Sequence, residues 1–282
     1  DPLWSRGLGD VYKRQQLKDA GIDPFYATFK DDWTVGQGWY DYSIGGSVDT
    51  IEFFDAMADE GAAVGPDSPV SFEKDFAEPM DQMMQLANDY TNEDAESRGY
   101  GDGNLAFSKG AAAMYMQGPW AFSEIAKTAP DLELGTFPLP MTDDPADLGV
   151  RVNMDLGAMI PEGSNHQEAA REFLEYLYLP ENIEAYNASQ LGFTPTKGAP
   201  APDDPRIEGM IEYYENGQIY QGPSVLVPKT IPVMNYAQAM VLGASTTSML
   251  RTMDADWARI AFRAPIPKTD DAAAGETEES AP

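Results

Sequence analysis

The chain has 282 residues, which exceeds the usual size of one domain, roughly 100–200 residues, and allows two lobes. It carries 47 acidic and 18 basic residues, and the resulting net charge of −29 argues against nucleic acid and anionic membranes as partners, since both bind through lysine and arginine. The absence of cysteine excludes disulfides, thiolate metal sites and cysteine nucleophiles.

Residues 1–15, DPLWSRGLGDVYKRQ, have no amphipathic period and are denser in arginine and lysine than the acidic remainder. The string DVYKRQ reads as a translation of a transposon end that is used in sequencing-library adapters. We therefore expect residues 1–15 to be an artefact of sequencing or cloning, and we exclude them from the fold prediction. The alternative is an ordinary basic N-terminal strand or helix. If the segment is foreign, a missing signal sequence says nothing about localisation.

The first half of the chain then predicts alternating helices and strands. A helix ends at Gly21, and an extended run covers Phe25–Phe29. Two amphipathic helices follow, one ending near Gly61 and one with Pro79 in its first turn. Their expected buried residues are Val48, Ile51, Phe54 and Met57 in the first, and Met80, Met83, Leu86 or Ala87, and Tyr90 in the second. A buried strand at 112–116 and a helix from Trp120 to about Lys127 come next.

The second half continues this alternation, which indicates an α/β fold. We expect strands over 132–137 and 152–160, with an acidic linker over 141–148 between them. A capping box at Ser164 and Gln167 predicts a helix that buries Ala170, Phe173, Leu174 and Leu177. Asp204-Pro205 is typical of a helix start, Gly217 of its end, and residues 232–262 predict helix with a break near 243–247. The acidic end, 266–282, is expected to be a disordered tail.

Catalytic and metal signatures are almost absent, so we predict no catalytic residues, no metal site and no cofactor. Ser71–Lys74 matches S-x-x-K only by letters, and the single histidine, His166, is expected on a helix surface. Asp32 and Asp155 could serve as an acid and base pair, although the sequence does not place them together. Gly101–Asn104 is typical of a turn, with too few carboxylates for calcium.

Tryptophans in polar, glycine-rich segments are more informative. Trp33 precedes the segment Gly36–Tyr40, and Trp120 follows Gly118-Pro119 at a predicted corner between strand and helix. An aromatic face covers the apolar face of a sugar ring while nearby carboxylates accept hydrogen bonds from its hydroxyls. A tryptophan in the hydrophobic core is the alternative for each position, and Trp120 in particular is expected to line a cleft without being wholly buried.

Five segments in order resemble the extracellular sugar-binding proteins that include maltose-binding protein. The most specific is FSKGAAAMYMQGPW at 107–120, similar to the family pattern F-x-x-G-x-A-A-M-x-x-x-G-x-W. The others are the helix end at 17–24, the Asp32-Trp33 segment, the strand, turn and helix at 156–177, and the turn Gly192–Pro195. Looser similarity continues to about residue 262, while most of the family's first lobe has no counterpart here.

This resemblance implies a two-lobed fold of the type II periplasmic-binding class, with the second lobe near complete and the first lobe partial. Residues 16–148 and 199–265 would form the second lobe, and 149–198 would return to the first, leaving Ile160, Phe173, Leu174 and Leu177 facing a gap. By motif, Trp33 and Trp120 would stack on the ligand. The polar contacts would be Asn153 and Asp155, with Asp32 and Tyr236 as weaker candidates.

The resemblance also implies a function, namely capture of a sugar or oligosaccharide by hinge closure for the permease of an ABC importer. The protein would then be an extracytoplasmic monomer, periplasmic or lipid-anchored, that binds no nucleic acid. Two alternatives stay open. One is a binding protein for a cationic solute such as a polyamine, which loop tryptophans also serve. The other is a glycoside-active enzyme that uses Asp32 and Asp155.

Overall fold

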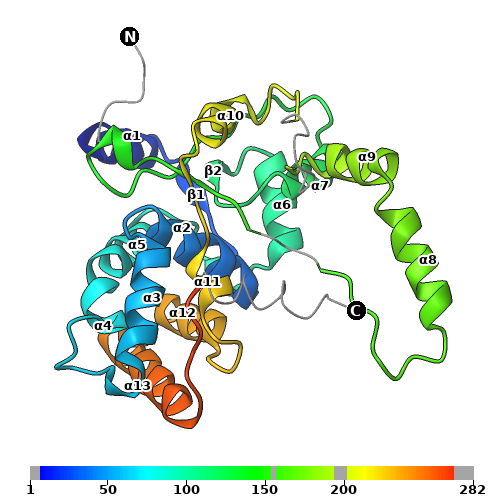
Figure 1. The fold of residues 1–282 in the computed structure, drawn as a ribbon. Coiled ribbons are helices and arrows are strands. Elements are labelled where there is room, and N and C mark those ends of the chain that lie inside the picture. The colour runs from blue at the N-terminus through cyan, green and yellow to red at the C-terminus, as the bar shows by residue number, and fades with distance from the viewer. Residues whose placement is uncertain (1–6, 154–156, 194–201, 270–282) are drawn as a thin grey trace.

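Helices dominate the structure, and two short pairs of parallel strands lie among them (Figure 1). This computed structural model describes residues 7–153, 157–193 and 202–269. Strand β1 (Asp23–Tyr26) pairs with β2 (Ala112–Tyr115), and β3 (Val150–Arg151) pairs with β4 (Ile219–Tyr220). The α-helices are α1 Gly7–Asp19, α2 Asp41–Gly45, α3 Thr50–Glu60, α4 Phe72–Asp75, α5 Ala77–Asp89, α6 Tyr100–Ser108, α7 Trp120–Ala126, α8 Gln167–Leu177, α9 Pro180–Gln190, α10 Glu208–Glu215, α11 Pro223–Leu226, α12 Val233–Val241 and α13 Thr246–Arg263.

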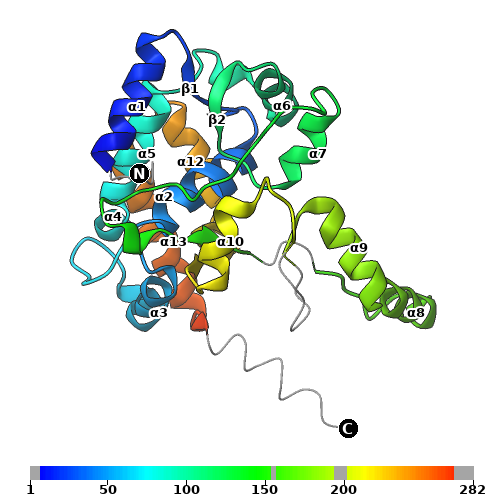
Figure 2. The same ribbon diagram turned by 90° about the horizontal axis from the view of Figure 1, so that it is seen from above.

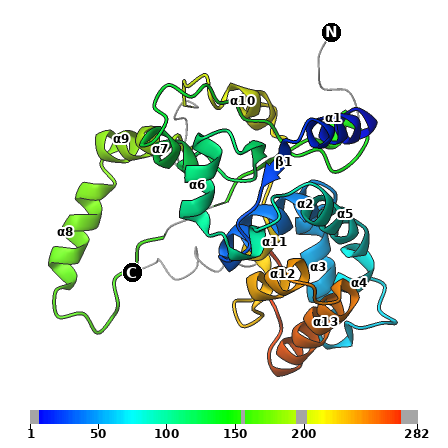
Figure 3. The same cartoon turned by 180° about the vertical axis from the view of Figure 1, so that it is seen from behind.

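The hydrophobic core lies among the helices α2 to α5, α12 and α13, which group together in Figures 1 and 3. Helix α3 starts where the Asp49 side chain accepts hydrogen bonds from two free N–H groups of the first turn, and it ends at Gly61, whose φ of +54° suits glycine. Its apolar stripe meets the stripe of α13. The fully buried side chains include Trp39, Tyr40, Phe72, Phe76, Met80, Met83, Leu250 and Trp257.

Several predicted elements are confirmed. The amphipathic helices that end near Gly61 and contain Pro79 are α3 and α5, and the helix predicted from Trp120 is α7. The break predicted in 232–262 separates α12 from α13, with Gly243 at a φ of +99°. Gly217, at a φ of +72°, follows α10 as predicted. The residues predicted to be buried in α5, Met80, Met83, Leu86 and Ala87, are buried.

Four predicted elements are wrong in type or extent. Residues 132–137 form no strand, because no described strand pairs with them. In the predicted strand at 152–160, none of the residues that the structure describes lies in a strand. Residues 101–104 are not a turn but belong to α6, where the Asp102 carboxylate accepts a hydrogen bond from the N–H of the preceding Gly99 at 3.0 Å. Helix α10 begins at Glu208 and not at Asp204-Pro205, because the Asp204 carboxylate accepts from the N–H and guanidinium of Arg206 in a local turn.

Helices α8 and α9 project away from the rest of the molecule, as Figures 1 and 2 show from two directions. Neither helix has a buried residue, so the predicted burial of α8 side chains is wrong in this structure. Phe173 is 61% exposed and Leu177 is also exposed. Apart from each other, the two helices have no extensive packing partner among the described elements. Apolar side chains of both helices, among them Phe173 and Tyr186, therefore face outward.

The residues after α13 return to the body. Ile266 packs against the core, the Lys268 ammonium lies 2.8 Å from the Asp59 carboxylate, and Thr269 donates two hydrogen bonds to Asp55. These contacts extend four residues into the expected tail, and residues 270–282 lie outside the described residues. In the parts of the chain that the structure describes, no helix combines the length and apolar character needed to cross a bilayer.

Candidate functional site

The carboxyl ends of β1 and β2 define one edge of the structure. Because the two strands are parallel, with Tyr26 opposite Tyr115, the segments that follow them leave the sheet on the same side. Trp33 lies in the segment after β1, and Trp120 opens the helix after β2. Ligands of open α/β folds bind outside the carboxyl ends of the strands. The two tryptophans predicted from sequence therefore share the edge where a ligand is expected.

Trp33 forms one corner of this edge together with Tyr100. Their ring centroids lie 5.1 Å apart at an interplanar angle of 61°, an edge-to-face contact, and both side chains are half-buried. The Asp31 carboxylate accepts a hydrogen bond from the Tyr100 N–H at 2.7 Å and so fixes the start of α6 beside the tryptophan. Sequence reasoning missed Tyr100, because it interpreted the residues that follow it as a turn and not as the first turn of a helix.

Trp120 forms the other aromatic group at this edge. Its indole Nε1 donates to the Gln117 side chain at 3.2 Å, and its ring lies directly over Gly118, where an added Cβ would meet ring carbons at 2.0–2.4 Å. Only glycine leaves space for the ring in this position. Trp120 is half-buried, so it is not wholly buried, as predicted; its place in a ligand cleft stays a prediction.

Asp32 lies in the segment after β1, and Tyr236 lies in α12. The two side chains bond to different partners. The Asp32 carboxylate accepts from the Asn235 amide at 2.9 Å, and the Gln238 amide donates to the carbonyls of Phe29 and Lys30. Tyr236 donates to the Asp256 carboxylate at 2.7 Å. Burial, together with this hydrogen bond, raises the pKa of Tyr236. The tyrosine hydroxyl is thus bound to α13 and does not join Asp32.

Asn153 follows β3 at a different point of the chain. Its side-chain oxygen accepts from the Gly222 N–H at 2.9 Å, while its Nδ2 is buried with no hydrogen-bond partner among the described residues. Such an unpaired donor is costly unless another group accepts from it. Asp155 lies outside the described residues, so the structure does not place it with Asn153 or with the tryptophans.

The aromatic residues at 39 and 40 do not belong to the site. We predicted a glycine-rich loop at 36–40, but the structure has a π-helical turn over Thr34–Tyr40 that buries Trp39 and Tyr40 in the core. Gly36 lies against α12, where an added Cβ would be 2.6 Å from the side chain of Met234. Gly36 therefore allows this turn to pack closely against α12, and it does not mark an exposed loop.

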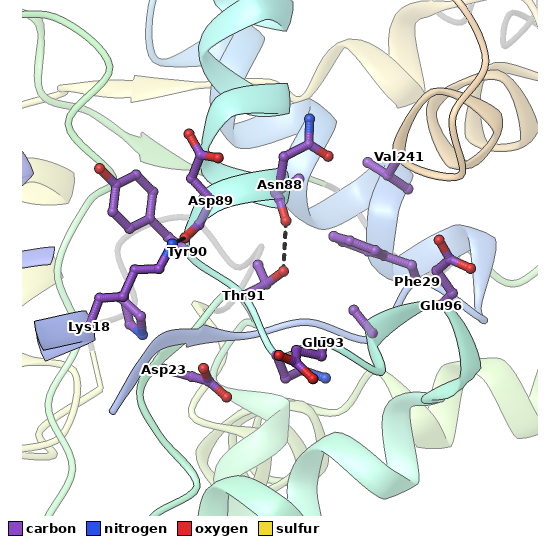
Figure 4. Close-up of a pocket in the computed structure, with 14 residues that line it drawn as sticks. Lys18, Asp23, Phe29, Asn88, Asp89, Tyr90, Thr91, Glu93, Glu96 and Val241 are labelled. Carbon is purple, nitrogen blue, oxygen red and sulfur yellow. Dashed lines mark hydrogen bonds between the residues drawn. The ribbon is translucent and has the colours of Figure 1, made fainter. Parts of the chain in front are cut away.

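A separate pocket of about 400 Å³ opens on the flank of β1, next to the end of α5 (Figure 4). Carboxylates of Asp23, Glu93 and Glu96 line it, and the Lys18 ammonium donates to the Asp89 carbonyl at its rim. Burial raises the pKa of Asp23, and the nearby Glu93 and Asp94 carboxylates act in the same direction. None of the residues predicted to bind ligand lines this pocket, and no group of three or more acidic or histidine side chains in the described ranges is placed to hold a metal ion.

Comparison with known proteins gives consistent results. A family model described as bacterial extracellular solute-binding protein matches residues 10–184. An uncharacterized ABC transporter extracellular-binding protein of Pyrococcus horikoshii is 22% identical over 237 residues, which are 82% of this chain and 50% of that protein. The chain thus spans about half the length of the curated relative that it matches.

Two solved structures have a similar fold. A chitin oligosaccharide binding protein aligns with a TM-score of 0.70 and 16% identity over 93% of this chain and 65% of that one. A manno-oligosaccharide specific solute binding protein of Bifidobacterium animalis subsp. lactis, in complex with mannotriose, aligns with a TM-score of 0.64 and 15% identity over 92% and 64% of the two chains. The likeness confirms the predicted fold class, the α/β fold of type II periplasmic binding proteins. With the match to the family model, it shows that this chain belongs to the bacterial extracellular solute-binding proteins.

Proposed function

We propose that the chain is part of the extracytoplasmic binding component of an ABC importer and that it captures a sugar or oligosaccharide. The observation that carries the proposal is the pair of half-buried tryptophans at the carboxyl edge of β1 and β2. Each ring contacts neighbouring residues and keeps a partly open surface, which suits stacking on the apolar face of a sugar. The two similar solved proteins are described as binding oligosaccharides, which supports the same ligand class.

Further parts of the proposal concern partners and location. We propose a monomer that delivers its ligand to a membrane permease, located in the periplasm or lipid-anchored at the cell surface. The family description supports an extracellular location, and the relative described as an ABC transporter protein supports the permease. No catalytic activity is part of the proposal. The Asp32 carboxylate, one of the two candidate catalytic groups, is hydrogen-bonded to Asn235, and sustained release of reducing sugar from an oligosaccharide would contradict a pure binding role.

Isothermal titration calorimetry tests the ligand class. We expect mannotriose or a chitin oligosaccharide to bind, and the polyamine spermidine to give no heat beyond dilution at physiological ionic strength. Spermidine is the matched alternative because the chain's net charge of −29 and its half-buried tryptophans would also suit a cation. Binding of spermidine without binding of any sugar would replace the sugar proposal with the cationic one.

Trp120→Ala is expected to weaken sugar binding by about 1–3 kcal/mol, the value of burying one large apolar side chain. The melting temperature should change little, because the indole is only half-buried and its Nε1 donates to the side chain of Gln117, a nearby residue of the same segment. Phe262→Ala is the matched control, since Phe262 is an aromatic residue at 84% exposure on α13. A large fall in melting temperature with unchanged affinity would show that Trp120 serves the core and not the ligand.

We also propose that residues 149–198 belong to the first lobe of the two-lobed fold, with 16–148 and 199–265 in the second. The exposed apolar side chains of α8 and α9, among them Phe173 and Tyr186, support this assignment. Hydrogen exchange should therefore be much faster in α8 and α9 than in α3 and α5, whose stripes are buried. Equal, strong protection of all four helices would contradict the assignment, because it would require a packing partner for α8 and α9 within this chain.

A further inference from the structure

Three elements that are distant in sequence meet at one buried carboxylate. Asp41 begins α2 and is fully buried, and the Arg151 guanidinium at the end of β3 lies 2.9 Å from it. Ser224, in α11, donates to the same carboxylate from its N–H at 2.8 Å and from its hydroxyl at 2.7 Å. Charge-assisted hydrogen bonds of this kind are roughly twice as strong as neutral ones. The carboxylate therefore ties β3 and the start of α11 to the helical body.

Gly222 is enclosed in the same cluster. An added Cβ on this residue would lie 2.1 Å from the Asp41 carboxylate and 2.8 Å from the Arg151 Nε, so only glycine fits between them. The Gly222 backbone therefore lies against both of these side chains. It also follows directly after β4, which pairs with β3. The N–H of Gly222 points to the side chain of Asn153 and donates to its Oδ1. We call Asp41, Arg151, Gly222 and Ser224 the β3 clamp.

The β3 clamp fixes the orientation of the Asn153 amide. The Gly222 N–H needs an acceptor, so the oxygen of the amide must face it, and Nδ2 faces the opposite way. This Nδ2 is buried and has no partner among the described residues. A buried, unpaired donor held in one orientation is expected where a ligand supplies the acceptor.

We propose that Asp41, Arg151 and Ser224 are positioning residues that hold Asn153 so that its Nδ2 donates a hydrogen bond to a hydroxyl oxygen of the bound sugar. This inference rests on the proposed function for its ligand, and on the contacts of the β3 clamp for its mechanism. In this proposal the clamp residues act on the ligand through the Gly222 backbone and the Asn153 amide, and not by direct contact.

The first arm of the test follows the clamp alone, in the full chain and without ligand. Asp41→Asn removes the ion pair, and Ser224→Ala removes one hydrogen bond and serves as the milder variant if Asp41→Asn folds poorly. Amide exchange of peptides that cover 150–153 and 219–224 should rise about tenfold or more in Asp41→Asn. Asp204→Asn, which breaks the exposed pair with Arg206, should leave these peptides unchanged. Unchanged exchange in both clamp variants would overturn the clamp.

The second arm measures mannotriose affinity. Asn153→Asp keeps an acceptor for Gly222 but removes the donor, so the Kd should rise about tenfold or more while exchange at 219–224 stays as in the wild type. In a double-mutant cycle, Asp41→Asn should weaken binding alone but add almost nothing to Asn153→Asp. Additive losses would show that Asp41 acts through general stability and would overturn its positioning role. A wild type that binds no sugar would contradict the proposed function and the role of Asn153, while the exchange arm still decides the clamp.

Discussion

Arg151→Met should lower the free energy of unfolding by about 3–5 kcal/mol, because it leaves the buried Asp41 carboxylate without its cation. The Arg151 side chain is only 9% exposed, and methionine keeps most of its apolar stem. Chemical denaturation of the full chain measures the loss. Arg206→Met is the matched control, since its partner Asp204 and its own guanidinium are partly open to solvent and such pairs contribute about 0–1 kcal/mol.

The Arg151→Met loss should depend on pH. Burial raises the pKa of Asp41 above its ordinary value, while Arg151 and the Ser224 hydrogen bonds act in the opposite direction. Without Arg151 the folded-state pKa of Asp41 rises further, so the folded state binds a proton more readily than the unfolded state. Stability then falls as the pH rises through that pKa. The neighbouring tyrosines, Tyr42 and Tyr220, stay neutral because burial raises their pKa values as well.

The penalty should therefore be smaller at pH 5 than at pH 8. Adding Asp41→Asn to Arg151→Met should recover part of the loss at pH 8, because the double variant has no unpaired charge to bury. If Arg151→Met and Arg206→Met cost the same small amount at both pH values, the buried ion pair has no role in holding β3.

Trp257→Ala should cost about 3–5 kcal/mol of unfolding free energy, the usual loss when a buried tryptophan is truncated. The indole is 1% exposed, and its Nε1 donates to the Met57 carbonyl at 3.0 Å. Its ring lies about 6 Å from the rings of Phe54 and Phe72, which joins α13 to α3 and α4. The change opens a cavity and also removes one of the two hydrogen bonds that the Met57 carbonyl accepts, the other being from the Gly61 N–H.

The control for Trp257→Ala is Phe262→Ala, an aromatic truncation on the same helix. Phe262 is 84% exposed, so its loss should change stability by no more than about 0.5 kcal/mol. Urea denaturation of both variants gives the comparison. A similar, small cost for both would mean that α13 is not part of the cooperative core.

The helical body could be predicted from sequence because its signals are local. In α5 the apolar spacing alone marks the buried face. In α3 the spacing correctly marks Phe54 and Met57, but Ile51, also predicted to be buried, is 37% exposed. Gly61 and Gly243 mark helix ends through positive φ angles. The strand predicted at 132–137 failed for a non-local reason. A strand needs a hydrogen-bonded neighbour, and this segment instead contacts α10 and the turn before it. Thr136 donates to the Arg206 carbonyl in that turn, and Gly209 of α10 lies against the Thr136 backbone.

In the candidate site, too, features set by local sequence could be predicted, and features set by contacts between distant segments could not. The half-buried position of Trp120 could be predicted from the strand, glycine and proline before it. Trp39 could not be separated from Trp33 by the same signal, since glycines near both suggested a loop, yet Gly36 makes room for Met234 of α12. Tyr100 and the β3 clamp were missed because they depend on contacts between distant segments, such as Asp41 with Ser224, that no sequence spacing reveals.

The most direct test of sugar binding at the edge of β1 and β2 is an NMR titration that follows the indole Nε1–H signals, assigned by single tryptophan substitutions. With mannotriose or a chitin oligosaccharide, the signals of Trp33 and Trp120 should shift in step with saturation. The signals of Trp39 and Trp257, both buried in the core, should stay in place and serve as internal controls. Saturable binding that leaves Trp33 and Trp120 unshifted, or no binding of any sugar, would contradict the assignment of this edge as the ligand site.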